Sequence, residues 1–341
     1  MNLLRKIQAT ACLAMLGMSL MASDPAGAAD VRIAYQPLVA IPQGAMKREG
    51  WYEEATGANV EWGNFSSGGD VNTAFAAGAI DIGLVGLPVF VSGIAQGIPY
   101  RLIMLYDVPG SMSGLAVQKD SGIEAIADLE GKRIGVPFGS GADYMLQAAL
   151  KENGVSPDDV TLVNLQPQPI VAAWSTGQID AAYIWSPILT ELMAQDGKLI
   201  LNDSDLAKLG YFAGDVGLVT DSFATGHPDL VTGWVEQNLR AVNWVNDNGA
   251  GAYDSMMAEY ELTPDQFRDT ALPPATSFPD LETLTSDQWF GNDAETIKKA
   301  SLRIGEFLAN NKLIARAPTP DEIANAIDAS FLETAKVPPY K

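Results

Sequence analysis

Val31-Arg-Ile-Ala-Tyr-Gln36, an apolar run that Pro37 ends, opens a regular alternation of strand-like and helix-like segments that decides the fold. Gly57 and Gly78 stop the two helix-like segments that follow. We expect strands at 31–36, 59–65, 80–85 and 101–106, and helices at 43–56, 70–77 and up to residue 96. Strands that alternate with helices in this way predict a largely parallel, doubly wound sheet.

A second alternation follows residue 118 and predicts a second lobe. Strands are expected at 132–136, 160–165 and 181–184, and helices at 142–153, 170–176 and 186–194. Gly217-Leu-Val219 resembles a return to the first lobe, and from His227 onward the chain is mainly helical. We therefore predict an α/β protein with two lobes, 30–117 plus 218–341 and 118–217, joined by a two-stranded hinge. Ligands bind beyond the carboxyl ends of strands in such sheets, so a cleft between the lobes is the predicted site.

The first 29 residues are interpreted as an export signal. A positively charged start precedes an apolar run from Ala9 to Met21, and Ala26-Gly-Ala-Ala29 offers small residues for cleavage. A membrane anchor is the alternative interpretation, but the run is too short to span a bilayer comfortably. Cys12, the only cysteine, lies near the start of this run, whereas a lipoprotein anchor needs its cysteine after it. We expect a periplasmic protein without membrane insertion.

The composition describes a globular chain with an acidic surface. Of its 341 residues, 47% are hydrophobic and 18% are charged, and 7 Trp, 10 Tyr and 11 Phe supply apolar surface for a core. The formal net charge is −21, and −22 without the export signal. Such a surface repels nucleic-acid phosphates and anionic membranes. We expect a monomer with no nucleic-acid partner.

Several enzyme classes lack their required residues in this chain. The single histidine, His227, precedes Pro228 at a predicted helix start, where a capping role is expected. Without a cysteine beyond the signal, a His/Cys metal site and a Cys-His nucleophile are excluded. No P-loop, G-x-S-x-G or G-x-G-x-x-G motif occurs. Asn202-Asp-Ser-Asp205 lacks the spacing of a calcium loop and is interpreted as a helix cap. We predict no catalytic residue, metal or cofactor.

Polar and aromatic residues gather where predicted strands end. Tyr35 and Gln36 end the first strand, and Tyr106 and Asp107 follow the fourth. Trp185 comes directly after the strand at 181–184, which favours a position in the cleft over burial in the core, the alternative. Because strand ends meet at the cleft, we predict aromatic and carboxylate side chains there.

The run Gly139-Ser-Gly-Ala-Asp143 opens the second-lobe helix predicted at 142–153. Ser140 is a candidate N-cap, and Asp143 three residues later completes a capping box. The free N–H groups of a helix start also attract anions. Capping and ligand contact both remain open as roles for these residues.

These residues belong to several longer runs by which the chain resembles the taurine-binding periplasmic proteins of the nitrate/taurine-type ABC importers. The runs are Ile33-Ala-Tyr-Gln36, Gly50-Trp-Tyr-Glu-Glu-Ala-Thr-Gly-Ala58, Ile134-Gly-Val-Pro-Phe138, Ala172-Ala-Trp-Ser-Thr-Gly-Gln-Ile-Asp-Ala181 and Tyr183-Ile-Trp-Ser-Pro187. The similarity extends from about residue 31 to 235 and more weakly to the end. It implies the type II periplasmic-binding-protein fold, with mixed sheets, a hinge and a ligand cleft, and a membrane permease as partner.

The resemblance also implies ligand contacts, and the chain departs from the family pattern at two of them. Relatives that bind taurine carry Gly-Ser-Ser-Pro after the third strand, where this chain has Gly86-Leu87-Pro88-Val89 without either hydroxyl. They carry Ser-Thr-Gly-His-Tyr at the second-lobe helix start, where this chain has Ser140-Gly-Ala-Asp143-Tyr144. Asp215 matches a family aspartate suited to an ammonium group. The cleft is thus predicted to keep its cation side and lose much of its anion side.

We therefore predict the substrate-binding protein of an ABC importer, which captures a small amine-bearing solute, taurine or a taurine-like zwitterion, by hinge closure. The alternative is a purely cationic amine, guanidinium or quaternary ammonium, because a carboxylate at position 143 would repel a sulfonate about 4 Å away by roughly 1–4 kcal/mol. A distant alternative is an enzyme like the thiamine-pyrimidine synthases, whose histidine and cysteine chemistry this chain lacks. Ligand sensing with a membrane receptor could coexist with transport. The predicted ligand-binding residues are Tyr35, Gln36, Leu87, Tyr106, Asp107, Ser140, Asp143, Tyr144, Trp185 and Asp215.

Overall fold

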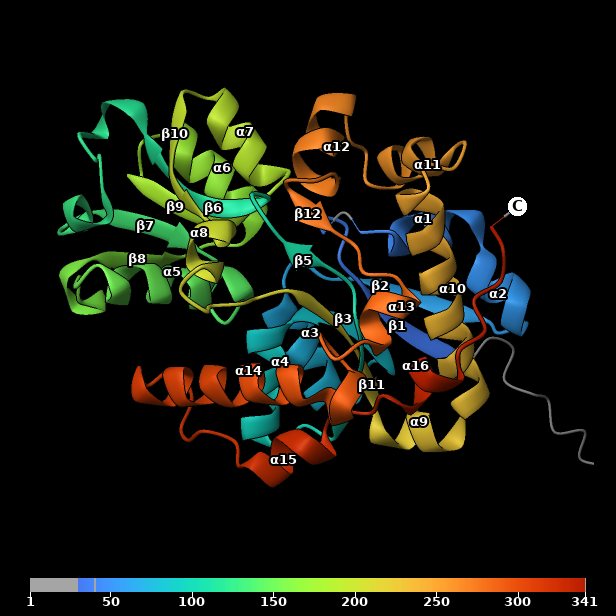
Figure 1. Cartoon of the computed structure of the whole chain (residues 1–341). Coiled ribbons are helices and arrows are strands. Elements are labelled where there is room, and N and C mark those ends of the chain that lie inside the picture. Colours follow the sequence, from blue (N-terminus) through green and yellow to red (C-terminus); the bar gives the residue numbers. More distant parts are fainter. Residues whose placement is uncertain (1–29, 40, 341) are drawn as a thin grey trace, which may run out of the picture.

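Two five-stranded sheets, each flanked by helices, organise the chain (Figure 1). The computed structural model describes residues 30–39 and 41–340. The export signal predicted at residues 1–29 lies outside the described residues. The two sheets correspond to the two predicted series of strands.

The first sheet has the strand order β2-β1-β3-β11-β4. Its strands are β1 (Val31–Tyr35), β2 (Val60–Asn64), β3 (Ile82–Gly86), β4 (Tyr100–Leu105) and β11 (Asp215–Thr220). β1 pairs in parallel with β2 and β3, whereas β11 runs antiparallel between β3 and β4. All five residues of β3 are buried, as expected for a strand with helices on both faces. The chain thus returns from the second sheet into the middle of the first.

Four helices connect the early strands of this sheet: α1 (Gln43–Glu49), α2 (Trp51–Thr56), α3 (Gly68–Ala76) and α4 (Leu87–Gln96). The sequence predicted a single helix over 43–56, but Gly50 adopts φ 67° and divides it into two. Only glycine takes this left-handed conformation without steric cost. α3 begins two residues earlier than predicted, because Ser67 accepts the N–H of Asp70 and forms the cap.

The second sheet has the strand order β10-β6-β9-β7-β8. Its strands are β6 (Ser113–Gln118), β7 (Arg133–Val136), β8 (Thr161–Asn164), β9 (Ala181–Trp185) and β10 (Gly197–Asn202). Its helices are α5 (Gly141–Glu152), α6 (Pro167–Ser175), α7 (Ile188–Ala194) and α8 (Asp203–Ala207). β7 pairs in parallel with β8 and β9, and β6 runs antiparallel between β9 and β10.

This pairing moves the expected boundaries between the lobes. The predicted boundary at residue 118 leaves β6 in the first lobe, but β6 pairs within the second sheet. The boundary at residue 217 falls inside β11, which belongs to the first sheet. Both differences arise because the prediction followed parallel βα units, whereas the strand beside each crossing runs antiparallel.

The chain passes between the sheets twice, before β6 and before β11. The first crossing contains the short strand β5 (Val108–Pro109), which pairs with β12 (Thr276–Ser277) from the C-terminal part of the chain. The N–H of Gly110 also donates to the carbonyl of Ala275 at 2.7 Å. The first crossing is therefore supported by a later segment as well as by its own strands.

The C-terminal part is helical, as predicted. Its helices are α9 (Asp221–Gly226), α10 (Pro228–Asn246), α11 (Ala252–Glu259), α12 (Pro264–Ala271), α13 (Leu281–Thr285), α14 (Gly291–Asn310), α15 (Pro320–Asn325) and α16 (Ser330–Thr334). α10 packs on α1 and α2, and α14 packs on α4. α14 continues beneath the second lobe (Figure 1), where Phe307 contacts Tyr144 of α5 with ring centroids 5.2 Å apart. Among the described residues, no helix combines the length and apolarity needed to cross a bilayer.

Candidate functional site

A small cavity lies between the two sheets, at the level of the two crossings. Its volume is about 60 Å³, enough for roughly four to six water molecules. The lining comes from both lobes: Gln36, Val39, Gly68, Gly86, Val89, Asp107, Pro109, Met112, Ser113, Ser140, Gly141, Ala142, Trp185, Asp203, Ala213 and Asp215. Five of these residues, Gln36, Asp107, Ser140, Trp185 and Asp215, are among the ten predicted from the sequence.

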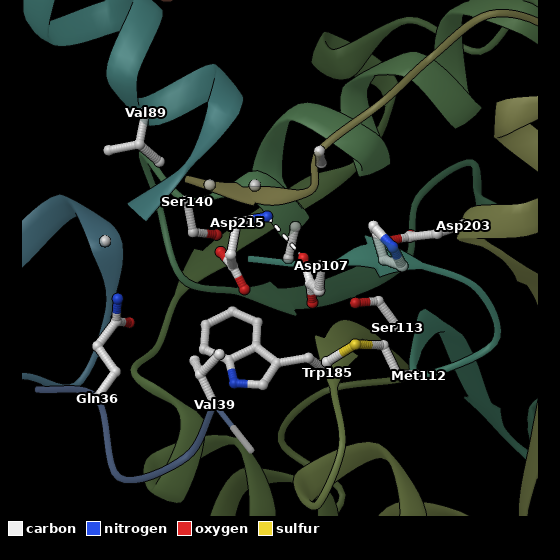
Figure 2. Close-up of a pocket in the computed structure, with 16 residues that line it drawn as sticks. Gln36, Val39, Val89, Asp107, Met112, Ser113, Ser140, Trp185, Asp203 and Asp215 are labelled. Atoms are coloured by element: carbon white, nitrogen blue, oxygen red, sulfur yellow. Dashed lines mark hydrogen bonds between the residues drawn. The ribbon is translucent and has the colours of Figure 1, made fainter. Parts of the chain in front are cut away.

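Three carboxylates, those of Asp107, Asp203 and Asp215, form one wall of the cavity. Asp107 lies on the first crossing and is 1% exposed, and Asp203 is 3% exposed. The backbone N–H of Asp215, at the start of β11, donates to Asp107 Oδ1 at 2.7 Å, which joins the two crossings. Figure 2 shows the carboxylates of Asp107 and Asp215 and the hydroxyl of Ser113 pointing toward the space beside the Trp185 ring.

Burial and mutual repulsion make these carboxylates weak acids. Burial raises the pKa of Asp107 to about 7, and the N–H of Asp215 offsets part of that rise. Burial raises the pKa of Asp203 to about 7, with a smaller contribution from the charge of Asp107. The pKa of Asp215 is raised well above its usual range by burial first, and then by the charges of Asp107 and Asp203. A positive group in the cavity would relieve both causes.

The third carboxylate reaches the cavity through long-range strand pairing. Asp203 is the first residue of α8, directly after β10, and β10 pairs with β6. The hydroxyl of Tyr183 on β9 donates to Asp203 Oδ1 at 2.7 Å and fixes the side chain. Ser113, the first residue of β6, lies beside it and also lines the cavity. From the sequence alone, this segment is predicted only as a helix cap.

Trp185 supplies the aromatic surface of the site and bridges the lobes. It is the last residue of β9 and is 9% exposed. Its indole Nε1 donates to the carbonyl of Leu38, in the loop after β1 of the other lobe, at 3.0 Å. The ring therefore has a fixed orientation, and its hydrogen-bond donor is already occupied by the protein.

Helix starts also line the cavity, close to Asp215, because Gly86 pairs directly with Asp215 across β3 and β11. Gly68 begins α3, Gly86 caps α4, and Ser140 caps α5, and all three line the cavity. A Cβ on Gly86 would lie 3.6 Å from the Cα of Gly141, so the starts of α4 and α5 approach closely across the lobes. The positive ends of helix dipoles favour negative groups, which include the neighbouring carboxylate of Asp215 as well as an anionic ligand.

The loop before α5 also touches the first lobe. A Cβ on Gly69 would lie 3.5 Å from the carbonyl of Phe138. The side chain of Phe138 itself is 43% exposed. This contact, together with the bond from Trp185 to Leu38, closes the two lobes over the cavity.

The other five predicted residues lie outside this lining. Strand alternation explains why Tyr35 and Tyr106 lie outside it, because neighbouring residues in an extended chain point to opposite sides. Gln36 and Asp107 face the cavity, so Tyr35 stacks on Tyr260 at 5.9 Å and Tyr106 accepts from Trp234 Nε1 at 3.1 Å.

The remaining three belong to helix starts. Leu87 is fully buried, and its N–H donates to the carbonyl of Gly214 at 2.9 Å. Asp143 turns back toward its own helix start, where Oδ2 accepts the N–H of Gly139 at 3.0 Å. Burial raises the pKa of Asp143. Tyr144 packs against Phe307 of α14. The contacts of Asp143 therefore indicate a structural role at its own helix start.

The lining combines three carboxylates with one indole. Among the described residues that line it, none is basic. No group of three or more His, Cys, Asp or Glu in the described part of the chain is arranged to hold a metal ion. His227 stands at the N-cap position of α10 without a side-chain capping hydrogen bond, packs against Phe223 with ring centroids 4.8 Å apart, and does not line the cavity.

Comparison with known proteins agrees with this architecture. The chain is similar to the taurine-binding periplasmic protein of Escherichia coli (strain K12), with 36% identity over 216 residues that cover 63% of this chain and 66% of that protein, just under two thirds. Its fold is similar to the alkanesulfonate-binding protein SsuA from Xanthomonas axonopodis pv. citri bound to MOPS, with a TM-score of 0.75, 24% identity and coverage of 88% of this chain and 98% of that one.

The same fold also occurs in an enzyme. The desulfurization enzyme DSZB matches with a TM-score of 0.62 and 18% identity, over 89% of this chain and 97% of that one. At this level of identity, these structural likenesses establish the fold alone.

The predicted periplasmic-binding-protein fold is confirmed. The family model described as "NMT1/THI5 like" matches residues 42–252, more than half of the sequence, and the chain therefore belongs to the NMT1/THI5-like family.

Proposed function

We propose that this chain is the periplasmic substrate-binding protein of an ABC importer, which captures a small amine-bearing solute and delivers it to a membrane permease. The observation that carries the proposal is the wall of three carboxylates around one indole, in a cavity closed by two lobes. Membership of the family and the names of the similar taurine-binding and alkanesulfonate-binding proteins support a transport role.

Electrostatics favour a ligand whose positive end enters this cavity. A positive charge about 4 Å from one carboxylate gains roughly 4 kcal/mol at an effective dielectric constant of 20. The neighbouring carboxylates of Asp107, Asp203 and Asp215 add to this attraction, and no basic side chain of the described lining opposes it. An ammonium can also interact with the face of Trp185.

A zwitterion fits the same cavity if its anionic end lies at the helix starts that line it. The starts of α3 and α5 offer backbone N–H groups there, although the hydroxyl of Ser140 is used to donate to the carbonyl of Pro137 at 2.6 Å. The site thus supports an aminosulfonate such as taurine, and a purely cationic amine is the second candidate because the donors on the anion side are few.

Delivery requires that the cavity open. The lobes meet through contacts such as that of Trp185 with Leu38, while two crossings connect them. Hinge motion about the crossings would release the ligand into the permease, the usual behaviour of two-lobed binding proteins. An enzymatic role has less support, because no histidine or cysteine of the described residues lines the cavity.

Titration calorimetry on residues 30–341 tests the proposal with three ligands: taurine, ethylamine and ethanesulfonate. We expect at least one of the two amines to bind at least a hundredfold more tightly than ethanesulfonate, which lacks the amine. Taurine above ethylamine would identify a zwitterion site, and the reverse order a cation site. Ethanesulfonate binding as tightly as the better amine would overturn the proposal.

A further inference from the structure

We infer that the positive group for which this cavity is built is a planar guanidinium or amidinium, stacked on Trp185 and held by Asp107, Asp203 and Asp215. The inference rests on the proposed function and narrows its ligand class. It follows from the acceptors, the aromatic surface and the size of the cavity.

The carboxylates offer more acceptor positions than an ammonium can use. Among the described residues, none donates a hydrogen bond to the carboxylate of Asp215. Asp107 accepts the N–H of Asp215 and the hydroxyl of Thr276, and Asp203 accepts the hydroxyls of Tyr183 and Ser113. Asp215 therefore supplies most of the free acceptor positions, and the other two carboxylates keep their remaining lone pairs. A primary ammonium has three donors, whereas a guanidinium presents a larger set in a rigid planar fork that matches carboxylates bidentately.

The aromatic surface distinguishes a planar cation from a quaternary one. Quaternary ammonium ligands are recognised by cages of several aromatic rings. Here Trp185 is the single aromatic residue of the described lining, and Tyr35, Tyr106 and Tyr144 pack elsewhere. One indole, held by its bond to Leu38, instead provides a single flat face, on which a guanidinium stacks.

Size and hydration point the same way. The cavity of about 60 Å³ suits a compact head group, and a guanidinium core has only four non-hydrogen atoms and an amidinium core three. A guanidinium is also more weakly hydrated than an ammonium, so it loses less on entering an enclosed site. These properties favour it over an ammonium of similar size, although both carry one positive charge.

Calorimetry at pH 8 with four small cations tests the inference: methylguanidine, acetamidine, methylamine and tetramethylammonium. We expect methylguanidine and acetamidine to bind at least tenfold more tightly than methylamine, and tetramethylammonium to bind most weakly. Low millimolar concentrations keep methylguanidine far below denaturing levels. Thermal unfolding with each ligand gives a second readout, because a bound ligand raises the unfolding midpoint.

Two variants connect the preference to the named residues. Trp185→Leu removes the flat face, and Asp215→Asn removes the carboxylate that lacks a protein donor. Each variant should weaken the binding of methylguanidine by about tenfold or more and reduce the ratio of its affinity to that of methylamine. Asp143→Asn is the matched control, because this buried carboxylate lies outside the cavity and should leave both affinities within twofold. Circular dichroism confirms that each variant is folded.

The outcomes separate this inference from the proposed function. If methylamine or taurine binds as tightly as methylguanidine, the planar-cation inference is wrong while the amine-binding function stands. If neither taurine nor any of the nitrogen cations binds, both are wrong. An unchanged ratio of methylguanidine to methylamine in Trp185→Leu and Asp215→Asn would also contradict the inference, even if methylguanidine binds.

Discussion

The starts of α5 and α8, both in the second lobe, carry nearly the same polar residues and use them differently. Ser140 and Asn202 cap the two helices, and an aspartate follows each cap at the third position. Asp143 accepts the N–H of Gly139 at 3.0 Å, and Asp205 accepts the N–H of Asn202 at 3.2 Å. Only α8 has a further acid, Asp203, at its first position, and this acid reaches the cavity.

This difference shows which acid of a helix start is free for a ligand. An aspartate at the third position can turn back to the N–H groups that precede the helix, as in a capping box. An aspartate at the first position cannot make that contact and points away from the helix start. Its role is then decided by what surrounds it, which for Asp203 is Tyr183, Ser113 and the cavity.

The largest effect should come from replacing Asp203 of α8 by asparagine, with Asp205 of the same helix as the control. Asp203→Asn removes one carboxylate of the cavity wall and should weaken binding of the proposed amine or guanidinium ligand by roughly a hundredfold, in line with 1.5–3 kcal/mol for a hydrogen bond to a charged group. Asp205→Asn, only two residues away, should change the affinity by less than twofold. Calorimetry measures both, and equal losses would remove the distinction between capping and ligand-binding acids.

A smaller effect should come from pH. Because the pKa values of Asp107 and Asp203 are raised to about 7, the ligand-free wall holds protons at pH 6 that a cation must displace. Affinity for a cation should therefore rise from pH 6 to pH 8 by roughly tenfold for each proton released. Calorimetry in buffers of different ionisation enthalpy counts those protons. A constant affinity over this range would mean that the wall is already ionised.

The same raised pKa values affect the stability of the ligand-free protein. When the pKa of an aspartate is higher in the folded state than in the unfolded state, the free energy of unfolding decreases as pH rises from about 4 to about 7. Asp203→Asn removes this cost. The variant should therefore unfold at a higher temperature than the parent protein at pH 8, with the difference shrinking at pH 5. A difference that does not depend on pH would contradict the assigned shift.

The smallest effect should come from the capping acid of α5. Asp143→Ala leaves the N–H of Gly139 without its acceptor and should lower the free energy of unfolding by about 1 kcal/mol. Asp143→Asn keeps an acceptor and should lose less. Ligand affinity should be unchanged in both variants that remain folded. A tenfold loss of affinity in Asp143→Asn would return this residue to the site.

Much of the fold followed from local patterns in the sequence. The alternation of strands and helices, the return at 217–219 and the position of Trp185 at a strand end were predicted from apolar runs and their punctuation. β10 at Gly197–Asn202 was not, and its pairing with β6 cannot be seen in either segment alone. The contribution of Asp203 depends on that pairing, so it was missed with the strand.

Five of the ten residues predicted for the site line the cavity, and strand alternation explains two of the five that do not. Tyr35 and Gln36, like Tyr106 and Asp107, are neighbours in extended chain, so one member of each pair must face away from the cavity. Strand alternation could have indicated this, although not which member. The polar residue faces the cavity in both pairs, and the tyrosine packs in the first lobe.

The contact of Phe138 with the start of α3 makes the protein suitable as a fluorescent sensor. Phe138 is an exposed side chain of one lobe whose backbone lies against Gly69 of the other. Residues 30–341 contain no cysteine, so Phe138→Cys would create a unique attachment point for an environment-sensitive dye. Separation of the lobes would move that dye from the neighbourhood of α3 into water. Its emission would then report ligand occupancy directly, without a labelled ligand.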